Sequence, residues 1–349
     1  MALRDVIGQD RAVDMLRGIL QKGRLASSYL FCGESGIGKK MTAVNFARAI
    51  NCLSAGHYRE EQGGEPSVFA SEMFPPPEST SPNATGGASG MDSCDACASC
   101  IKFASGTHPD FLMISPEERQ IRIEEIRMID EALSFKPFEG RMKVVVVDDA
   151  EMMNPAAANA FLKTLEEPPA ASVIILVSSR PELLPATIRS RCSRILFSPL
   201  PSEACRRVLE DRVPDQALDV ITRLSMGRPG LALSADLIAE RDWFLELLGG
   251  MLRAEKDAWS SRDDMERWLD LLLIFLRDMT VFRVTGSGTG LINGDLADEV
   301  QRLAQSIEVK GIIYIYRELS FLKGMSMFNL NKSVTWNYTS SLLRKEMPV

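Results

Sequence analysis

Two hydrophobic patterns alternate along residues 1–200. Short runs in which nearly every residue is apolar are typical of strands buried on both faces of a parallel sheet. Longer stretches between them carry apolar residues three and four positions apart, which is typical of helices that pack one face on a sheet. The runs lie at Tyr29–Cys32, Phe111–Ile114, Lys143–Asp149, Ser172–Ser179 and Arg194–Phe197. This alternation predicts an α/β domain with a parallel sheet and helices on both of its faces.

Strand patterns end at Pro201, and only helical spacing follows. Residues 201–242 contain short helical stretches, and residues 243–349 contain longer ones with apolar stripes. We therefore expect an α/β domain over 1–200, a short helical module over 201–242 and an all-α region over 243–349. No cluster of ionisable residues in the last domain indicates chemistry, so its expected role is packing or oligomerisation.

A glycine-rich loop, Gly33–Lys40 with the sequence GESGIGKK, follows the first predicted strand and precedes a helical stretch. Strand, glycine turn and helix together favour a phosphate-binding loop (P-loop), because glycines let backbone N–H groups curve around an anion at a helix N-terminus. The lysine at position 39 is placed to neutralise the β- and γ-phosphates of a nucleotide. The expected phosphate-binding residues are Gly33, Gly36, Gly38 and Lys39.

The residue after Lys39 departs from this pattern. A P-loop normally has Ser or Thr there, whose hydroxyl binds Mg²⁺, whereas Lys40 offers an ammonium that cannot bind a cation. Thr42 does not replace the hydroxyl, because two residues further along the helix it faces another side. We therefore expect a P-loop fold with a degenerate magnesium site, in which binding of ATP or ADP is weak or absent.

Two carboxylates end the apolar run at 143–149. Asp148 stands where P-loop ATPases hold Mg²⁺ through water, and Asp149 stands where they often carry a Glu that orients the attacking water. Aspartate is one methylene shorter and reaches that water less well. Ser178 and Ser179 end the following strand, where their hydroxyls either bind a γ-phosphate or cap the strand. The degenerate site is therefore expected to include Lys40, Asp148, Asp149 and Ser179.

Seven cysteines in a chain without a recognisable signal peptide favour metal binding or burial over disulfides. Cys94, Cys97 and Cys100 have CxxCxxC spacing, and Cys52 at the end of the preceding helical stretch supplies a fourth thiolate. A closed Cys₄ site favours structural zinc, with an iron–sulfur cluster and unligated thiols as alternatives, and His57 is a weaker alternative ligand. No open coordination position is implied, so we expect the metal to be structural.

Arg191 is the strongest catalytic candidate. It lies on a short helical stretch, Pro185–Cys192, which we expect at the carboxyl edge of the sheet, pointing away from its own P-loop. From there its guanidinium can reach the γ-phosphate held by a neighbouring subunit and stabilise the transition state. The simpler alternative is a surface ion pair.

Charge and hydropathy limit the remaining possibilities. A formal net charge of −7 disfavours a protein that coats nucleic acid over its whole surface. The longest apolar runs are too short to span a membrane, and we expect a cytoplasmic protein. Leu53–Ser93 is rich in Gly, Ser, Pro and Glu without periodicity, so we expect a surface loop there.

Taken together, these stretches resemble the clamp-loader branch of the AAA+ ATPases, in particular the clamp-loader subunits of bacterial DNA polymerase III. The resemblance covers about the first 235 residues. It is most specific in five places: Val6–Gln9, Gly33–Lys40, Cys52 with Cys94–Cys100, Leu162–Pro169 and Ser190–Cys192.

The resemblance implies a three-domain chain: an AAA+ α/β domain carrying the zinc module, a helical lid and a helical collar. The collar would join a five-subunit ring with gamma/tau and delta subunits. Primer–template DNA and the sliding clamp would be reached through that complex. The resemblance also implies that Arg191 acts in trans as an arginine finger.

Three departures separate the chain from the ATP-hydrolysing gamma/tau subunit. That subunit should have Ser or Thr at position 40, Glu at 149 and an arginine in the lid stretch that begins at Gly227, where this chain has Lys40, Asp149 and Gly230. The pattern favours a subunit without its own ATPase that serves a neighbour. The alternatives are an active gamma/tau-type ATPase and a zinc-dependent nucleic-acid adaptor with a vestigial P-loop. The adaptor is disfavoured because Lys102 and Phe103 are the only basic and aromatic residues close to the cysteines.

Overall fold

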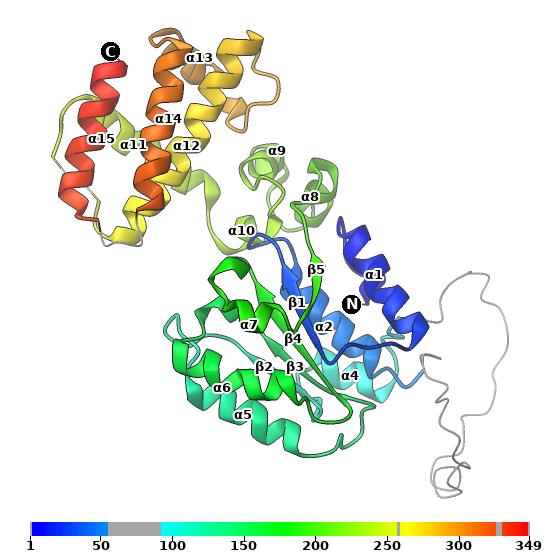
Figure 1. The fold of residues 1–349 in the computed structure, drawn as a ribbon. Helices are drawn as coiled ribbons and strands as arrows, with labels where there is room; N and C mark the ends of the chain where they lie inside the picture. Colours follow the sequence, from blue (N-terminus) through cyan, green and yellow to red (C-terminus); the bar gives the residue numbers. More distant parts are fainter. Residues whose placement is uncertain (1, 55–91, 257–258, 326–329, 348–349) are drawn as a thin grey trace, which may run out of the picture. The chain divides into compact units, whose positions relative to one another are not determined.

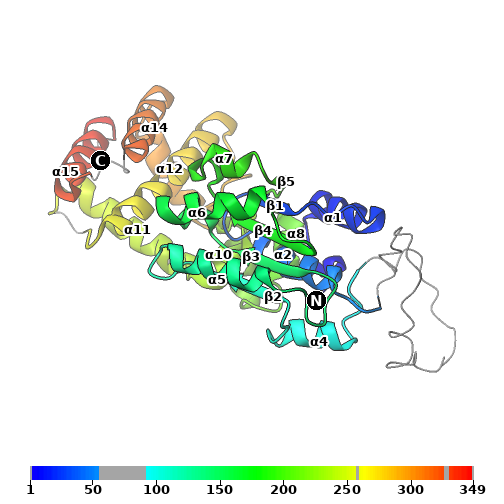
Figure 2. The ribbon, with the colours of Figure 1, turned by 60° about the horizontal axis from the view of Figure 1, so that its bottom comes forward.

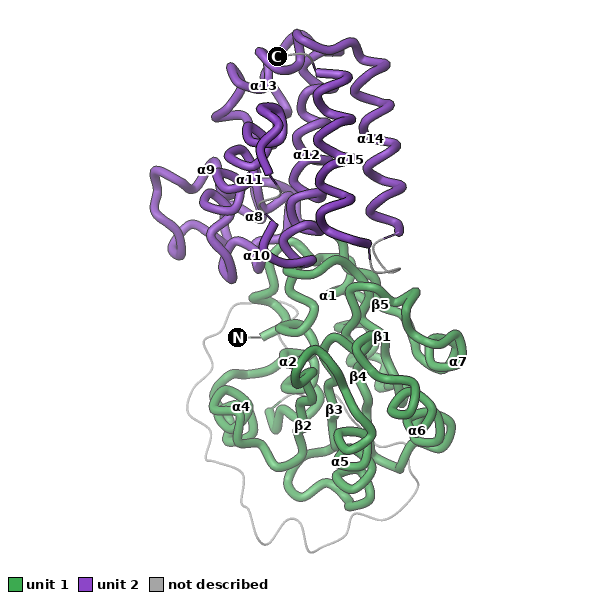
Figure 3. Tube along the Cα trace, turned by 90° about the vertical axis from the view of Figure 1, so that its left-hand side faces the viewer, with its two compact units in different colours: residues 1–198 green, residues 199–349 purple. Residues whose placement is uncertain are grey.

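The computed structural model describes residues 2–54, 92–256, 259–325 and 330–347. The chain forms two compact units, Met1–Ser198 and Pro199–Val349, which Figure 3 shows in different colours. His57 and most of the predicted loop at 53–93 lie outside the described residues.

The first unit is built on a parallel sheet of five strands (Figure 1). The strand order is β2-β3-β4-β1-β5. The strands are β1 (Ser28–Cys32), β2 (Phe111–Ile114), β3 (Lys143–Val147), β4 (Ser172–Ser178) and β5 (Ser193–Leu196). Every residue of β1 and β4 is buried, which explains their continuous apolar sequences. The predicted parallel α/β sheet is therefore confirmed, with each predicted strand within one or two residues of its observed bounds.

Helices cover both faces of this sheet (Figure 2). Alternate side chains of the central strands, such as Leu30 and Ile174, pack against α5, α6 and α7. On the opposite face Tyr29 and Phe31 pack against Phe46 of α2. The helices are α1 (Asp10–Lys22), α2 (Lys39–Ile50), α4 (Ala98–Ala104), α5 (Ile123–Ser134), α6 (Pro155–Glu166) and α7 (Ala186–Arg189).

Local sequence features fix the start of α6 and the end of α1. Asn154 caps α6 by accepting a hydrogen bond from Ala157 N, and Pro155 occupies the first turn. Gly23 ends α1 in the left-handed conformation.

The second unit is entirely helical over its described residues. Its helices are α8 (Ser202–Leu209), α9 (Asp215–Leu224), α10 (Pro229–Ser234), α11 (Leu237–Leu252), α12 (Arg262–Thr285), α13 (Ala297–Gln305), α14 (Val309–Gly324) and α15 (Lys332–Glu346). Its core gathers buried aromatic side chains, among them Phe244, Trp268 and Phe275. A buried carboxylate, Asp278, accepts hydrogen bonds from Ile292 N and Asn293 N and so fixes the end of the glycine-rich connection before α13.

Helix α11 begins at Leu237, six residues before position 243, where the sequence predicts the longer helices to start. The side chain of Asp236 accepts hydrogen bonds from Ile238 N and Ala239 N, which sets the first turn at Leu237. The helix runs through residue 242, and the division of this unit into lid and collar stays a prediction. No described helix is long and apolar enough to cross a membrane.

Candidate nucleotide site and metal centre

The P-loop lies at the carboxyl edge of the sheet, between β1 and α2. Gly33, Gly36 and Gly38 all have positive φ angles, as a loop that curves around an anion requires. Gly33 is also tightly enclosed, because a Cβ atom added to it would lie 2.5 Å from the carbonyl oxygen of Phe197 and 2.8 Å from Ile37 Cδ1. A side chain at position 33 would displace the chain that follows β5.

The two lysines of the loop have different environments. Lys39 is 6% exposed, and its Nζ donates a hydrogen bond to the carbonyl oxygen of Glu34 at 2.6 Å. Burial lowers the pKa of Lys39, against the attraction of Glu151, Asp149 and Asp148, which raises it. The side chain of Lys39, which binds phosphate in a P-loop, therefore bonds here to a carbonyl oxygen of the same loop.

Lys40 is directed at the carboxylate of the neighbouring strand end. Its Nζ lies 2.9 Å from Asp148 Oδ2 and donates a hydrogen bond to Ser115 Oγ at 3.4 Å. The ammonium therefore occupies the side of Asp148 that a magnesium ion with its water would need. Thr42 adds no ligand, because its buried Oγ1 donates to the carbonyl oxygen of Gly38.

The remaining candidate residues of the site also lie at the carboxyl edge of the sheet. Asp149 has a left-handed backbone conformation, with φ at 44°. Burial, together with the charges of Asp148 and Glu151, raises the pKa of Asp149.

Ser179 is held by a residue that the sequence analysis did not select. The carboxylate of Glu151 accepts hydrogen bonds from Ser179 N at 3.0 Å, Ser179 Oγ at 2.6 Å and Arg180 N at 3.1 Å. Burial alone would raise the pKa of Glu151, but the bonds from Ser179 lower it. The serine that would bind a γ-phosphate is thus engaged by an internal anion. The available signal was the position of Glu151, three residues after Asp148 on the same edge.

Arg191 is not where the sequence analysis placed it. The predicted carboxyl edge is wrong. The segment between β4 and β5 returns to the amino edge, because both strands run parallel to β1, and Arg191 lies two residues before β5. Arg191 is therefore at the amino edge, opposite its own P-loop. Its Nη2 lies 2.5 Å from Glu166 Oε1, and its Nη1 donates to the carbonyl oxygen of Thr187 at 2.9 Å. Glu166 lies in the stretch Leu162–Pro169, one of the five that carry the family resemblance.

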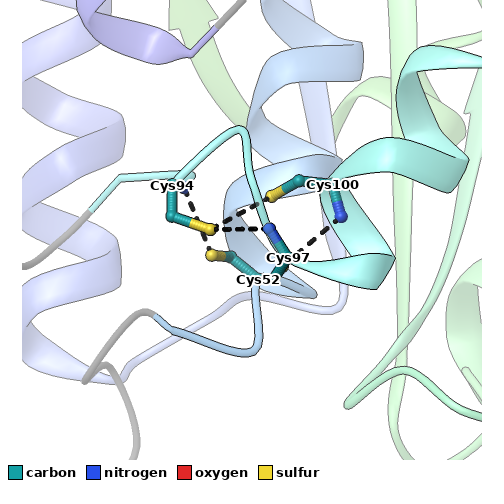
Figure 4. A group of neighbouring side chains, drawn as sticks. All are labelled: Cys52, Cys94, Cys97 and Cys100. Carbon is teal, nitrogen blue, oxygen red and sulfur yellow. Dashed lines mark hydrogen bonds between the residues drawn. The ribbon is translucent and has the colours of Figure 1, made fainter. Parts of the chain in front are cut away.

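The four predicted metal ligands come together at the end of α2 and the start of α4 (Figure 4). Their sulfur atoms all lie within 4.8 Å of one another, and they belong to Cys52, Cys94, Cys97 and Cys100. Sulfurs of a tetrahedral zinc site are about 3.8 Å apart, as follows from Zn–S bonds of about 2.3 Å. The donor set and its spacing therefore fit zinc.

Backbone N–H groups point at these sulfurs, as the dashed lines in Figure 4 show. Cys97 N donates to Cys94 Sγ at 3.2 Å, and Cys94 N donates to Cys52 Sγ at 3.3 Å. Burial would raise the pKa of Cys94, but N–H groups of Ala96 and Cys97 lower it to about 6. Burial raises the pKa of Cys100. The site thus prepares at least one thiolate, the form that binds metal.

The residues around these cysteines also hold the start of the chain. Asp92 accepts hydrogen bonds from Leu3 N at 2.9 Å and Arg4 N at 2.8 Å. Asp95 lies 2.8 Å from Arg48 Nη1 on α2 and 3.3 Å from Arg4 Nη2. The segment that carries the cysteines, α2 and the N-terminal segment therefore form one hydrogen-bonded group.

The fold and the sites together define a class: an α/β domain with a P-loop-type glycine loop, which carries a four-cysteine module and is followed by a helical unit. The chain belongs to the family described as DNA polymerase III, delta subunit, whose sequence model matches residues 8–75 and 82–201.

Curated relatives agree with this assignment. The chain is 27% identical to DNA polymerase III subunit delta' of Bacillus subtilis, over 85% of this chain and 84% of that protein. It is 30% identical to the delta' subunit of Pseudomonas aeruginosa, over 80% of this chain and 79% of that protein. It is also 30% identical to DNA polymerase III subunit tau of Salmonella typhimurium, over 68% of this chain but 33% of that protein.

Proposed function

We propose that this chain acts as the delta-prime-type subunit of a DNA polymerase III clamp loader, which loads a sliding clamp onto primed DNA. It would assemble with gamma/tau and delta subunits in a five-subunit ring, reach the clamp and the primer–template through that complex, and hydrolyse no ATP itself. Membership of the family and similarity to delta' subunits over most of the chain support the assembly.

The ion pair between Lys40 and Asp148 carries the proposal that the chain does not hydrolyse ATP. Hydrolysis at a P-loop requires Mg²⁺ bound by a hydroxyl and a carboxylate. Here an ammonium replaces the hydroxyl and neutralises the carboxylate, and the hydroxyl of Ser179 is bound by Glu151. A hydrolysing subunit would have an arginine in the lid stretch, but this chain has Gly230 at that position. The nearby Arg228 is the N-cap residue of α10.

Arg191 supports the second half of the proposal, that the chain serves a neighbouring ATP site. It is at the sheet edge opposite its own P-loop, so any triphosphate it contacts must belong to another subunit. Guanidinium is suited to this task because it stays charged and donates several hydrogen bonds to phosphate oxygens. Arginine fingers accelerate phosphoryl transfer by about 10³- to 10⁵-fold.

The experiment compares the reconstituted complex with wild-type and Arg191→Ala subunits. We expect the variant to assemble normally. The DNA-stimulated ATPase rate of the complex should fall by the part of that rate that comes from the ATP site contacted by Arg191. Arg194→Ala, an exposed change on β5 nearby, is the control and should leave the rate unchanged. An Arg191→Ala complex with unchanged ATPase would disprove the finger role.

The metal is proposed to be structural zinc. The four thiols fit it, and they are tied to the N-terminal segment rather than to the nucleotide residues. A gamma/tau-type ATPase is the second candidate function, favoured by the similarity to tau. Turnover of ATP by the purified chain, lost on Lys39→Ala, would establish it.

A further inference from the structure

Glu166 is the acidic partner of Arg191. It ends α6, six residues before β4, and so lies at the same amino edge of the sheet as Arg191. The side chains of Arg191 and Glu166 are 34% and 50% exposed, so solvent reaches both. An exposed ion pair of this kind adds little to the free energy of folding. Its main consequence is therefore that it restricts the conformation of the Arg191 side chain.

The two contacts of Arg191 hold its guanidinium from two sides. Glu166 Oε1 accepts from Nη2, and the carbonyl oxygen of Thr187, one turn earlier in the chain, accepts from Nη1. Guanidinium has five N–H donors, and these contacts within the described residues use two of them. Three N–H groups are left to donate to an anion while both contacts persist. The pairing therefore restricts the side chain without consuming its capacity to bind phosphate.

We infer that Glu166 is a positioning residue, which orders Arg191 before the neighbouring ATP site closes on it. This inference rests on the proposed function, because it presumes that Arg191 acts in trans. A free arginine side chain loses rotamer freedom when it docks on a phosphate, and an arginine already held in place loses less. Pre-ordering lowers the activation barrier only if the interaction with Arg191 is strongest in the transition state.

The test measures ATP turnover by the reconstituted, DNA-stimulated complex carrying Glu166→Ala. We expect kcat at the served site to fall by about threefold, within the range that exposed ion pairs contribute, while the KM for ATP stays constant. Glu166→Gln keeps an acceptor oxygen and should recover part of the loss. Glu167→Ala, at the adjacent position, is the matched control and should have no effect.

A double variant separates this inference from the proposed function. In an Arg191→Ala background, Glu166→Ala should change nothing further, because the residue it orders is gone. If Arg191→Ala lowers turnover and Glu166→Ala does not, the positioning role is disproved and the finger role stands. If Arg191→Ala itself has no effect, the finger role fails first. A loss shared by Glu167→Ala, or an additive loss in the double variant, would also overturn the inference.

Discussion

The ammonium of Lys40 lies 2.9 Å from the carboxylate of Asp148, so two residues of one nucleotide-type site neutralise each other. In an active P-loop site these two positions act together on Mg²⁺. Here they form an ion pair instead, and under the proposed function Lys40 therefore keeps Asp148 from binding Mg²⁺.

Replacement of Lys40 should make nucleotide binding depend on magnesium. Lys40→Thr removes the ammonium from Asp148 and supplies a hydroxyl, so we expect ATP to bind about tenfold more tightly with Mg²⁺ than with EDTA. Titration calorimetry on the purified chain measures the difference. Lys40→Ala is the control, since it frees Asp148 without adding a ligand and should gain less. Tight, magnesium-dependent ATP binding by the wild-type chain would contradict this account.

The four-cysteine centre should hold one zinc ion per chain. Elemental analysis of the purified protein tests this, and Cys97→Ser should lower both the zinc content and Tm, because binding of the metal stabilises the folded state. Cys205→Ser is the control: this buried cysteine contacts Ser225 Oγ in the second unit and should leave the zinc content unchanged. Iron in place of zinc would reject the metal assignment.

Loss of the metal should also loosen the start of the chain. Asp92 accepts hydrogen bonds from the amides of Leu3 and Arg4. Asp92→Asn should speed the hydrogen exchange of these amides by about tenfold, because a hydrogen bond to a charged acceptor contributes about 1.5–3 kcal/mol. Chelation of the metal should speed the same amides, because Asp92 lies two residues from Cys94. If the amide hydrogen-exchange rates of residues 2–5 do not change after chelation, the N-terminal segment is held independently of the metal.

Asp110 predicts a defined pH dependence of stability. Its buried carboxylate accepts hydrogen bonds from Phe138 N, Glu139 N and Gly140 N. Burial alone would raise the pKa of Asp110, but these three bonds lower it. A lowered pKa means that the folded state releases this proton more readily, so the stabilisation is complete above about pH 4 and is lost as the pH falls through the folded-state pKa.

We therefore expect Asp110→Ala to lower the free energy of unfolding at pH 7 by about 3 kcal/mol. Denaturant unfolding at several pH values measures the loss, which should shrink below about pH 4 as the wild-type carboxylate becomes protonated. Glu131→Ala, an exposed change on α5, is the control. A loss that stays constant down to pH 2 would show that the charge of Asp110 contributes nothing.

The sequence predicted the fold well because burial on both faces of a parallel sheet leaves a strong pattern. The strands at 143–147 and 172–178 needed only their apolar runs, and the cysteine cluster needed only its spacing. The start of α11 was missed because it depends on one side chain, Asp236, which overrides the apolar periodicity around it.

Side-chain pairs between distant segments were the part that the sequence could not supply. The contacts of Glu151 with Ser179 and of Glu166 with Arg191 join residues 28 and 25 positions apart. They depend on how the turns bring α6, α7 and the strand ends together. The edge assigned to Arg191 was wrong for a different reason. A segment that directly precedes a strand of a parallel sheet lies at the amino edge, so the predicted strand after Cys192 already implied the observed position.

Gly33 bears on how this family's sequences are interpreted. A glycine at the head of a P-loop suggests a surviving capacity for nucleotides, yet here even a methyl group would collide with the carbonyl of Phe197. The backbone here requires a glycine whether or not a nucleotide binds. A glycine at position 33 is thus explained by packing alone, and by itself it is no evidence that this loop binds ATP.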